Sequence, residues 1–184
     1  MAIDVAKIQS AKDLKPDALG AVFDYYAPAI YKYAFRLCRD SIEADQIVGD
    51  VFSTLLEQLA AGKGPETNLR AYLYQVAYHL VVDHVRERQR IGIVDENDPE
   101  RNASSVVSQA ENRILLDALE SAISNELTSE QRQVITLRFQ ENFSLQETAR
   151  IVGRNVNAVK ALENRGVKKL RQVLEKVRQE EELL

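Results

Sequence analysis

The sequence predicts an all-α protein made of two small helical domains joined by a flexible linker. Apolar residues recur with the spacing of helices along most of the 184-residue chain, and the strict alternation that is typical of strands is missing. One polar and acidic stretch, residues 92–109, holds too few apolar residues to build a core. We therefore expect a first domain over 15–91, a linker over 92–109 and a second domain over 110–177.

Three long helices are expected in the first domain, where they would pack into one bundle. Pro16 is favoured in the first turn of a helix, Ser41 is a suitable N-cap, and a breaker over Gly62–Pro65 ends the second helix. The three helices are expected over about 16–38, 41–60 and 68–90. The inner face of the first helix is expected to hold Leu19, Val22, Phe23, Tyr26, Ile30, Tyr33, Ala34 and Leu37. That of the second is expected to hold Ile47, Val51, Leu55 and Leu59, and that of the third Leu69, Leu73, Val76, Ala77, Leu80 and His84.

The second domain is expected to open with two helices. The first contains Leu115, Leu116, Leu119 and Ile123. Thr128 and Gln131 form a capping-box pattern at the start of the next helix. The apolar residues of that helix are Val134, Ile135, Leu137 and Phe139.

The stretch Leu145–Val159 has the spacing of a helix-turn-helix. Ala149 provides a small residue where the two helices touch, Gly153 tolerates a positive φ in the turn, and Val159 is the branched apolar residue of the second helix. Asn155 follows the turn and can cap the second helix. The plainer alternative is a helical hairpin with a solvated basic face.

The second helix of this motif combines amide, cationic and small side chains, which suit base edges and phosphates in a major groove. Residues 154–176 contain seven lysines and arginines against two glutamates, a net charge of +5, whereas the whole chain carries −4. The positive field is therefore local, and we expect DNA binding that is weak alone and reinforced by a partner. The candidate DNA-binding residues are Arg154, Asn157, Lys160, Asn164, Arg165, Lys168 and Arg171.

Several other functions are disfavoured by composition. Cys38 is the only cysteine, so an internal disulfide is excluded, and we expect it to be a small core residue in a reducing compartment. His79 and His84 are five residues apart and would not face one metal ion from one helix. Glu141 and Glu147 are expected to be solvated rather than a catalytic pair. We expect no enzymatic activity, no metal, no cofactor and no membrane insertion, and a cytoplasmic location.

Two sets of residues resemble conserved regions of the extracytoplasmic-function (ECF) bacterial sigma factors. Residues 33–37, 44–52 and 70–77, with Asp83 and Arg86, resemble region 2. Residues 127–170 resemble region 4. The matching residues there include Arg132, Leu137, Arg138, Phe139, Glu147–Ala149, Val159–Leu162 and Arg165. The two resemblances occur in the expected order and cover about 140 residues.

The resemblance implies that the first domain docks on the β′ clamp helices of core RNA polymerase and melts the minus-ten element, while the second reads the minus-35 element. The implied partners are core RNA polymerase (β′ clamp helices and β flap), promoter DNA and an anti-sigma factor. By position, the polymerase-binding residues are Asp45, Gln46, Val48, Gly49, Asp50 and Phe52. The minus-ten residues are Lys63, Asn68, Arg70, Tyr72, Tyr78, His79, Arg86 and Arg88, and the loop over 62–68 would capture a flipped base.

The residues themselves fit these roles. Glycines in the loop allow backbone freedom, and tyrosines and arginines suit opened single-stranded DNA. For Tyr72 a core position is an equal alternative. Gln46 and Gly49 depart from the family pattern, which usually has an acidic residue and a glutamine there. They motivate one alternative function, a sigma mimic that titrates an anti-sigma factor, although a decoy needs no basic recognition helix. A repressor with an effector domain is a third hypothesis.

Overall fold

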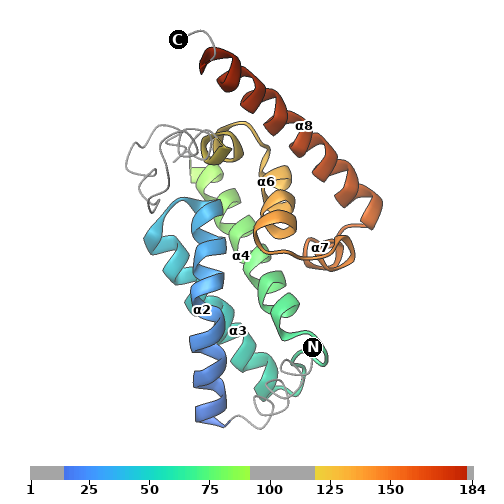
Figure 1. The fold of residues 1–184 in the computed structure, drawn as a ribbon. Coiled ribbons are helices and arrows are strands. Elements are labelled where there is room, and N and C mark those ends of the chain that lie inside the picture. Colours follow the sequence, from blue (N-terminus) through green and yellow to red (C-terminus); the bar gives the residue numbers. More distant parts are fainter. Residues whose placement is uncertain (1–14, 92–118, 182–184) are drawn as a thin grey trace. The chain divides into compact units, whose positions relative to one another are not determined.

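The structure is a computed structural model that describes residues 15–91 and 119–181. The chain divides into two compact units, Met1–Arg101 and Asn102–Leu184. Every regular element of the described residues is a helix, so the predicted all-α class with two helical domains is confirmed (Figure 1). The predicted linker over 92–109 lies outside the described residues, as do Leu115 and Leu116 of the helix expected after it.

The first unit is a bundle of three helices, each of which packs against the other two (Figure 1). They are α2 (Pro16–Cys38), α3 (Ser41–Ala60) and α4 (Leu69–Ile91), which lie within one residue of the predicted bounds. The N-cap of α3 is Asp40 rather than the predicted Ser41. The Asp40 carboxylate accepts a hydrogen bond from the Glu43 N–H at 3.0 Å, and Ser41 is the first helical residue.

The core of the first unit lies where the three helices meet. Tyr33 of α2 and Tyr74 of α4 are fully buried, and their rings make an edge contact with centroids 5.2 Å apart. Tyr74 and Val81 were not among the residues predicted to face inward, although both are completely buried. Phe23, in contrast, was predicted to lie on the inner face of its helix, but it is 45% exposed at the edge of the bundle.

The second unit begins with helical residues 119–125 and continues through α6 (Ser129–Ile135), the π-helical turn η2 (Thr136–Gln140), α7 (Leu145–Ile151) and α8 (Val156–Glu181). The predicted capping box of Thr128 and Gln131 is present at the start of α6. Ala122, Leu127, Ile135 and Leu170 form part of the core. Gly166 allows α8 to approach α6 closely, since a Cβ at this position would lie 3.0 Å from Cγ1 of Ile135.

Two predictions are wrong because of the π-helical turn. The sequence predicts one regular helix with Phe139 on its inner face, but Phe139 is 54% exposed. The N–H of Glu141 bonds to the carbonyl of Thr136 at 3.0 Å, a step of five residues instead of four. This wider turn rotates the following side chains, so that Phe139 points outward while Glu141, which was expected to be solvated, is buried.

No helix among the described residues is both long enough and apolar enough to cross a membrane.

Candidate nucleic-acid interface

The turn between α7 and α8 is built by local hydrogen bonds. Ser144 caps α7 in a capping box, in which the Glu147 carboxylate accepts from the Ser144 N–H at 2.9 Å. Glu147, expected to be solvated, therefore closes the N-terminus of α7. Gly153 has a φ of +65° in the turn, as its position predicts. Asn155 caps α8, since its side-chain oxygen accepts from the Ala158 N–H at 2.8 Å.

The packing of the two helices confirms the helix-turn-helix. Ala149 is buried where α7 meets α8, and Val159 is completely buried. Thr148 and Val152 of α7 are also buried. Val156 is 39% exposed, because it stands at the first residue of α8. The core of the motif thus holds the second helix firmly and leaves its outer side open.

The outer side of α8 carries the predicted DNA-binding residues. Residues at positions 157, 160, 164, 168 and 171 recur every three or four residues, so they form one stripe along the helix. Arg165 flanks the stripe. All of the predicted residues are exposed: Arg154, Asn157, Lys160, Asn164, Arg165, Lys168 and Arg171. The structure therefore brings together amide and cationic side chains on a face that can enter a groove.

Some basic side chains near α8 are already paired with carboxylates. Arg154 forms an ion pair with Glu130 of α6. Lys169 lies 3.5 Å from the Glu126 carboxylate and also donates to the Glu126 carbonyl. Within the described ranges no ion pair involves Lys160, Arg165, Lys168 or Arg171, so these charges remain available for phosphates.

One interaction missed by the sequence analysis fixes α8 in the unit. Arg138 of η2 donates from Nε to the Glu163 carboxylate at 2.9 Å, and both side chains are largely buried. Arg138 also donates to the carbonyl of Phe143, the residue before the Ser144 cap. The Arg138 guanidinium therefore links α8 to the start of α7 and compensates the charge of Glu163. The presence of Arg138 within an apolar helix could have signalled a buried ion pair. Its partner Glu163 lies 25 positions later, so the sequence alone does not identify it.

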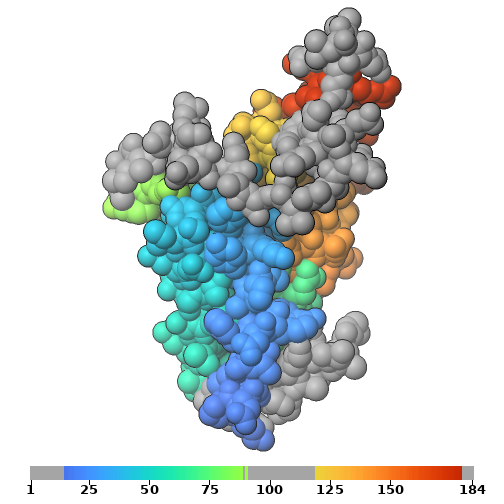
Figure 2. Space-filling view, turned by 60° about the vertical axis from the view of Figure 1, so that its left-hand side comes forward, coloured from blue at the N-terminus to red at the C-terminus, as the bar shows by residue number. Residues whose placement is uncertain are grey.

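In the first unit, the predicted polymerase-binding residues fall into two groups. Val48 and Phe52 are buried, whereas Asp45, Gln46, Gly49 and Asp50 are exposed on α3. Figure 2 shows α2 (blue) and α3 (cyan to teal) side by side on one face. Phe23 of α2 lies over Phe52 with ring centroids 4.8 Å apart, and Leu56 of α3 is 43% exposed. Neither Phe23 nor Leu56 was predicted to belong to this surface.

The predicted base-capture loop is packed more tightly than its glycines suggested. Gly62 has a φ of +69°, so its backbone needs the freedom of glycine. Gly64 lies against the end of α3, where a Cβ would be 2.5 Å from Cδ2 of Leu59. Lys63, between the two glycines, is exposed. The glycines thus serve close packing as well as the turn.

Two predicted minus-ten residues at the start of α4 make contacts within the unit. Asn68 is a helix cap, because its side-chain oxygen accepts from the Ala71 N–H at 2.8 Å. The guanidinium of Arg70 lies over the ring of Tyr74, 5.3 Å from its centroid. Both contacts hold the first turn of α4 in place.

The outer face of α4 carries three of the predicted residues. Tyr72, His79 and Arg86 are seven residues apart and therefore lie on one side of the helix. Tyr72 is half-buried, which fits both alternatives given for it, and burial raises the pKa of its phenol. Tyr78 makes an edge contact with His79 at 5.4 Å. Arg86 is highly exposed, with Asp83 at 3.7 Å.

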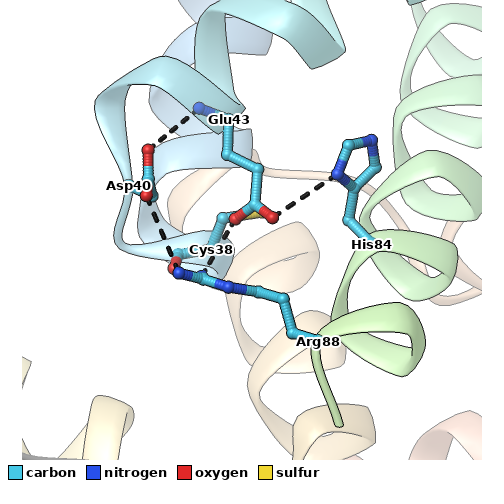
Figure 3. Close-up of polar contacts among 5 residues, drawn as sticks. All are labelled: Cys38, Asp40, Glu43, His84 and Arg88. Carbon is cyan, nitrogen blue, oxygen red and sulfur yellow. Dashed lines mark hydrogen bonds and ion pairs between the residues drawn. The ribbon is translucent and has the colours of Figure 1, made fainter. Parts of the chain in front are cut away.

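Arg88, in contrast, is turned toward the other helices (Figure 3). Its Nη1 lies 3.0 Å from Oε2 of Glu43, and Nη2 lies 3.7 Å from the Asp40 carboxylate. His84 Nδ1 lies 3.4 Å from the other oxygen of Glu43. Burial, and next the charge of Glu43, raise the pKa of the Cys38 thiol to about 12. Cys38 is buried as predicted, and its thiol stays protonated.

Both units match known protein families. Residues 22–91 match Sigma-70 region 2, and residues 125–172 match Sigma-70, region 4. The chain belongs to the sigma-70 family of RNA polymerase sigma factors.

This sigma factor is similar to members of the ECF group. The ECF RNA polymerase sigma factor BldN of Streptomyces coelicolor is 29% identical over 174 residues, covering 91% of this chain and 64% of BldN. The ECF sigma factor SigX of Bacillus subtilis is 27% identical, covering 86% of this chain and 84% of SigX. The structure of the sigma factor RpoE from Bartonella quintana, in complex with the anti-sigma factor NepR, shares the fold. Its TM-score is 0.64 at 20% identity, over 85% of this chain and 96% of that one.

Proposed function

We propose that this ECF sigma factor directs core RNA polymerase to promoters, where its second unit reads the minus-35 element and its first unit melts the minus-ten element. The observation that carries the proposal is the stripe on α8, where exposed amides alternate with cations that have no carboxylate partner among the described residues. Amides suit base edges and cations suit phosphates. Both units would act in the cytoplasm, by binding alone and without covalent chemistry.

The exposed face of α3 is the proposed surface for the β′ clamp helices. Asp45 and Asp50 provide negative charge there, and Phe23 and Leu56 extend the surface with exposed apolar area. Interfaces of this kind combine an apolar centre with a charged rim. The family resemblance adds the β flap as the polymerase element next to the second unit.

An anti-sigma factor is the third proposed partner. The RpoE structure contains such a protein, NepR. The same exposed apolar residues that would face polymerase are available to a competing partner. Binding of that partner would keep the sigma factor from polymerase.

A sigma mimic is the second candidate function, and the specific observation in its favour is Gly49. This residue presents no side chain on the exposed face of α3, where the family pattern usually has a glutamine. Such a protein would bind an anti-sigma factor without engaging polymerase. The exposed cations of α8 favour the promoter-reading function, because a decoy has no use for them.

Two adjacent lysines provide a sharp test of promoter reading. Lys168→Ala should weaken binding to all minus-35 sequences about equally and reduce the salt slope by about 1, because one phosphate contact is lost. Lys169→Ala is the matched control, since Lys169 is already paired with Glu126.

Asn164→Ala tests base reading. It should weaken binding to the preferred minus-35 sequence by about 1–3 kcal/mol and flatten discrimination at one or two positions.

The measurement is binding of the polymerase holoenzyme to a set of minus-35 variants at several salt concentrations. If neither Lys168→Ala nor Asn164→Ala changes affinity, α8 is not the promoter reader. If the protein binds an anti-sigma factor but forms no holoenzyme with core polymerase even when no anti-sigma factor is present, the mimic is the correct function.

A further inference from the structure

Three helix ends of the first unit meet at one carboxylate, that of Glu43 (Figure 3). Glu43 stands in the first turn of α3, and its two oxygens face Arg88 at 3.0 Å and His84 at 3.4 Å, both from α4. Arg88 also donates to the carbonyl of Cys38, the last residue of α2, at 3.4 Å. Asp40, the cap of α3, lies 3.7 Å from the same guanidinium. The Glu43 cluster, namely Glu43, Asp40, His84 and Arg88, therefore ties α4 to the other two helices.

This cluster is placed where the apolar core no longer holds α4. Val81 is completely buried, but after it no residue of α4 whose side chain is described is buried. The last turns of the helix keep only partial apolar burial, at Val82 and Val85, and the polar contacts of His84 and Arg88 add the directional contacts there. Burial of apolar surface is non-directional, whereas charged hydrogen bonds set a definite geometry. The cluster thus determines the rotation and position of the end of α4.

The charge of Glu43 is effective because the carboxylate is shielded. Its side chain is only 13% exposed, and the side chain of Arg88 is 28% exposed. Removing the charge of Glu43 would leave the partly buried Arg88 with only the more distant carboxylate of Asp40, at 3.7 Å, as compensation. The exposed pair of Glu87 and Arg90 on the same helix differs in this respect, since both side chains are more than half exposed.

We propose that Glu43 is a positioning residue for promoter opening, because it holds the end of α4, through Arg88 and His84, against the start of α3. The inference rests on the proposed function: α3 docks on polymerase, and the outer face of α4, with His79 and Arg86, contacts opened DNA. Part of any force between DNA and polymerase then passes from α4 to α3 through this cluster, beside the apolar core that the two helices share. Arg88 accordingly supports the promoter-facing helix instead of contacting a phosphate.

The test uses the full-length protein with core polymerase and two promoter templates, one fully duplex and one already melted over the minus-ten region. Glu43→Gln should leave polymerase affinity unchanged and slow opening of the duplex template about tenfold, the size expected for losing a charged hydrogen bond. Transcription from the pre-melted template should be normal. Glu87→Gln, which removes an exposed charge from the same helix, is the control and should have no effect.

A double-mutant cycle separates positioning from direct DNA contact. If Glu43 acts through Arg88 and His84, adding Glu43→Gln to Arg88→Met should slow DNA opening by less than Glu43→Gln does alone, because only the His84 contact remains to be lost. Additive effects would overturn the proposal. It would also be overturned if Arg88→Met reduced the salt slope of DNA binding while Glu43→Gln had no effect, since Arg88 would then contact a phosphate.

The remaining outcomes are also decisive. A wild-type protein that neither binds polymerase nor opens a promoter would overturn the proposed function and this inference together. A wild type that opens the duplex at the same rate as Glu43→Gln would overturn the inference alone. If Glu43→Gln fails to fold, it loses both templates, and His84→Gln then replaces it. His84→Gln keeps the Glu43–Arg88 pair and should slow opening of the duplex template by a smaller factor, with normal transcription from the pre-melted template. If His84→Gln and the wild type open the duplex template at the same rate, the positioning role is refuted.

Discussion

Replacing Gly49 by alanine should stabilise the first unit, although the residue lies in the proposed docking surface. Gly49 is in the middle of α3, is exposed, and has an ordinary helical backbone. A Cβ at this position would meet nothing within 4 Å. The substitution therefore introduces no clash, and its effect on the free energy of unfolding comes from helix propensity alone.

The expected gain follows from the difference between glycine and alanine inside a helix. Glycine is less favourable by about 1 kcal/mol, because its unfolded backbone has more freedom to lose. For a unit of this size, about 1 kcal/mol corresponds to a rise in Tm of roughly 4–8 °C. Gly62→Ala is the matched control, because the φ of +69° at Gly62 makes the same chemical change unfavourable there.

The assay can report on the first unit within the full chain. All seven tyrosines lie between Tyr25 and Tyr78, so tyrosine fluorescence during heating follows this unit only. Gly49→Ala should raise the midpoint and Gly62→Ala should lower it. A lower midpoint for Gly49→Ala would refute the reasoning, because it would mean that the Cβ is obstructed or that α3 is not a regular helix at this residue.

Two further predictions concern the same unit. Asp50→Arg should abolish co-purification with core polymerase and leave the tyrosine melting curve nearly unchanged, because Asp50 is exposed on α3; undiminished co-purification would contradict the docking surface. The pKa of Cys38 is raised from 9.0 to about 12 in the folded state, so the unfolded chain releases the thiol proton first and stability should fall as pH rises above 9, by at most about 1.4 kcal/mol per pH unit. Denaturant unfolding followed by far-UV circular dichroism between pH 8 and 10 should show a shallower fall for Cys38→Ala, and parallel curves would contradict the assigned burial.

Much of the fold could be predicted because its signals are local. The bounds of α2, α3 and α4 follow from apolar periodicity, from Pro16 and from the breaker over Gly62–Pro65. The helix-turn-helix followed from Ala149, Gly153 and Asn155, each of which meets a steric or hydrogen-bonding requirement of the turn. These requirements involve residues only a few positions apart.

The errors arose where distant residues or small changes of register decide the structure. The π-helical turn shifts the inner face of the helix by one residue, and no periodicity in the sequence marks where the shift occurs. Asp40 and Ser41 are both good N-caps, and the choice depends on which side chain meets the N–H of Glu43. The pairing of Arg88 with Glu43, 45 positions earlier, could likewise not be seen from the sequence, and the assignment of Arg88 to DNA stays a prediction.

The charge of α8 shows how such distant partners change a functional inference. The sequence gives a net charge of +5 over residues 154–176, but Arg154 and Lys169 are paired with Glu130 and Glu126, which lie outside that range. The cations of this range left for DNA are then those of the stripe and its flank, together with Lys176. Since the affinity for DNA depends on how many phosphates a protein neutralises, a second unit with so few available cations should bind weakly by itself. Tethering it to polymerase raises its effective concentration at the promoter, which compensates for a weak intrinsic contact. In the proposed function, dependence on polymerase would therefore follow from how the acidic residues of α6 and of the segment before it are placed.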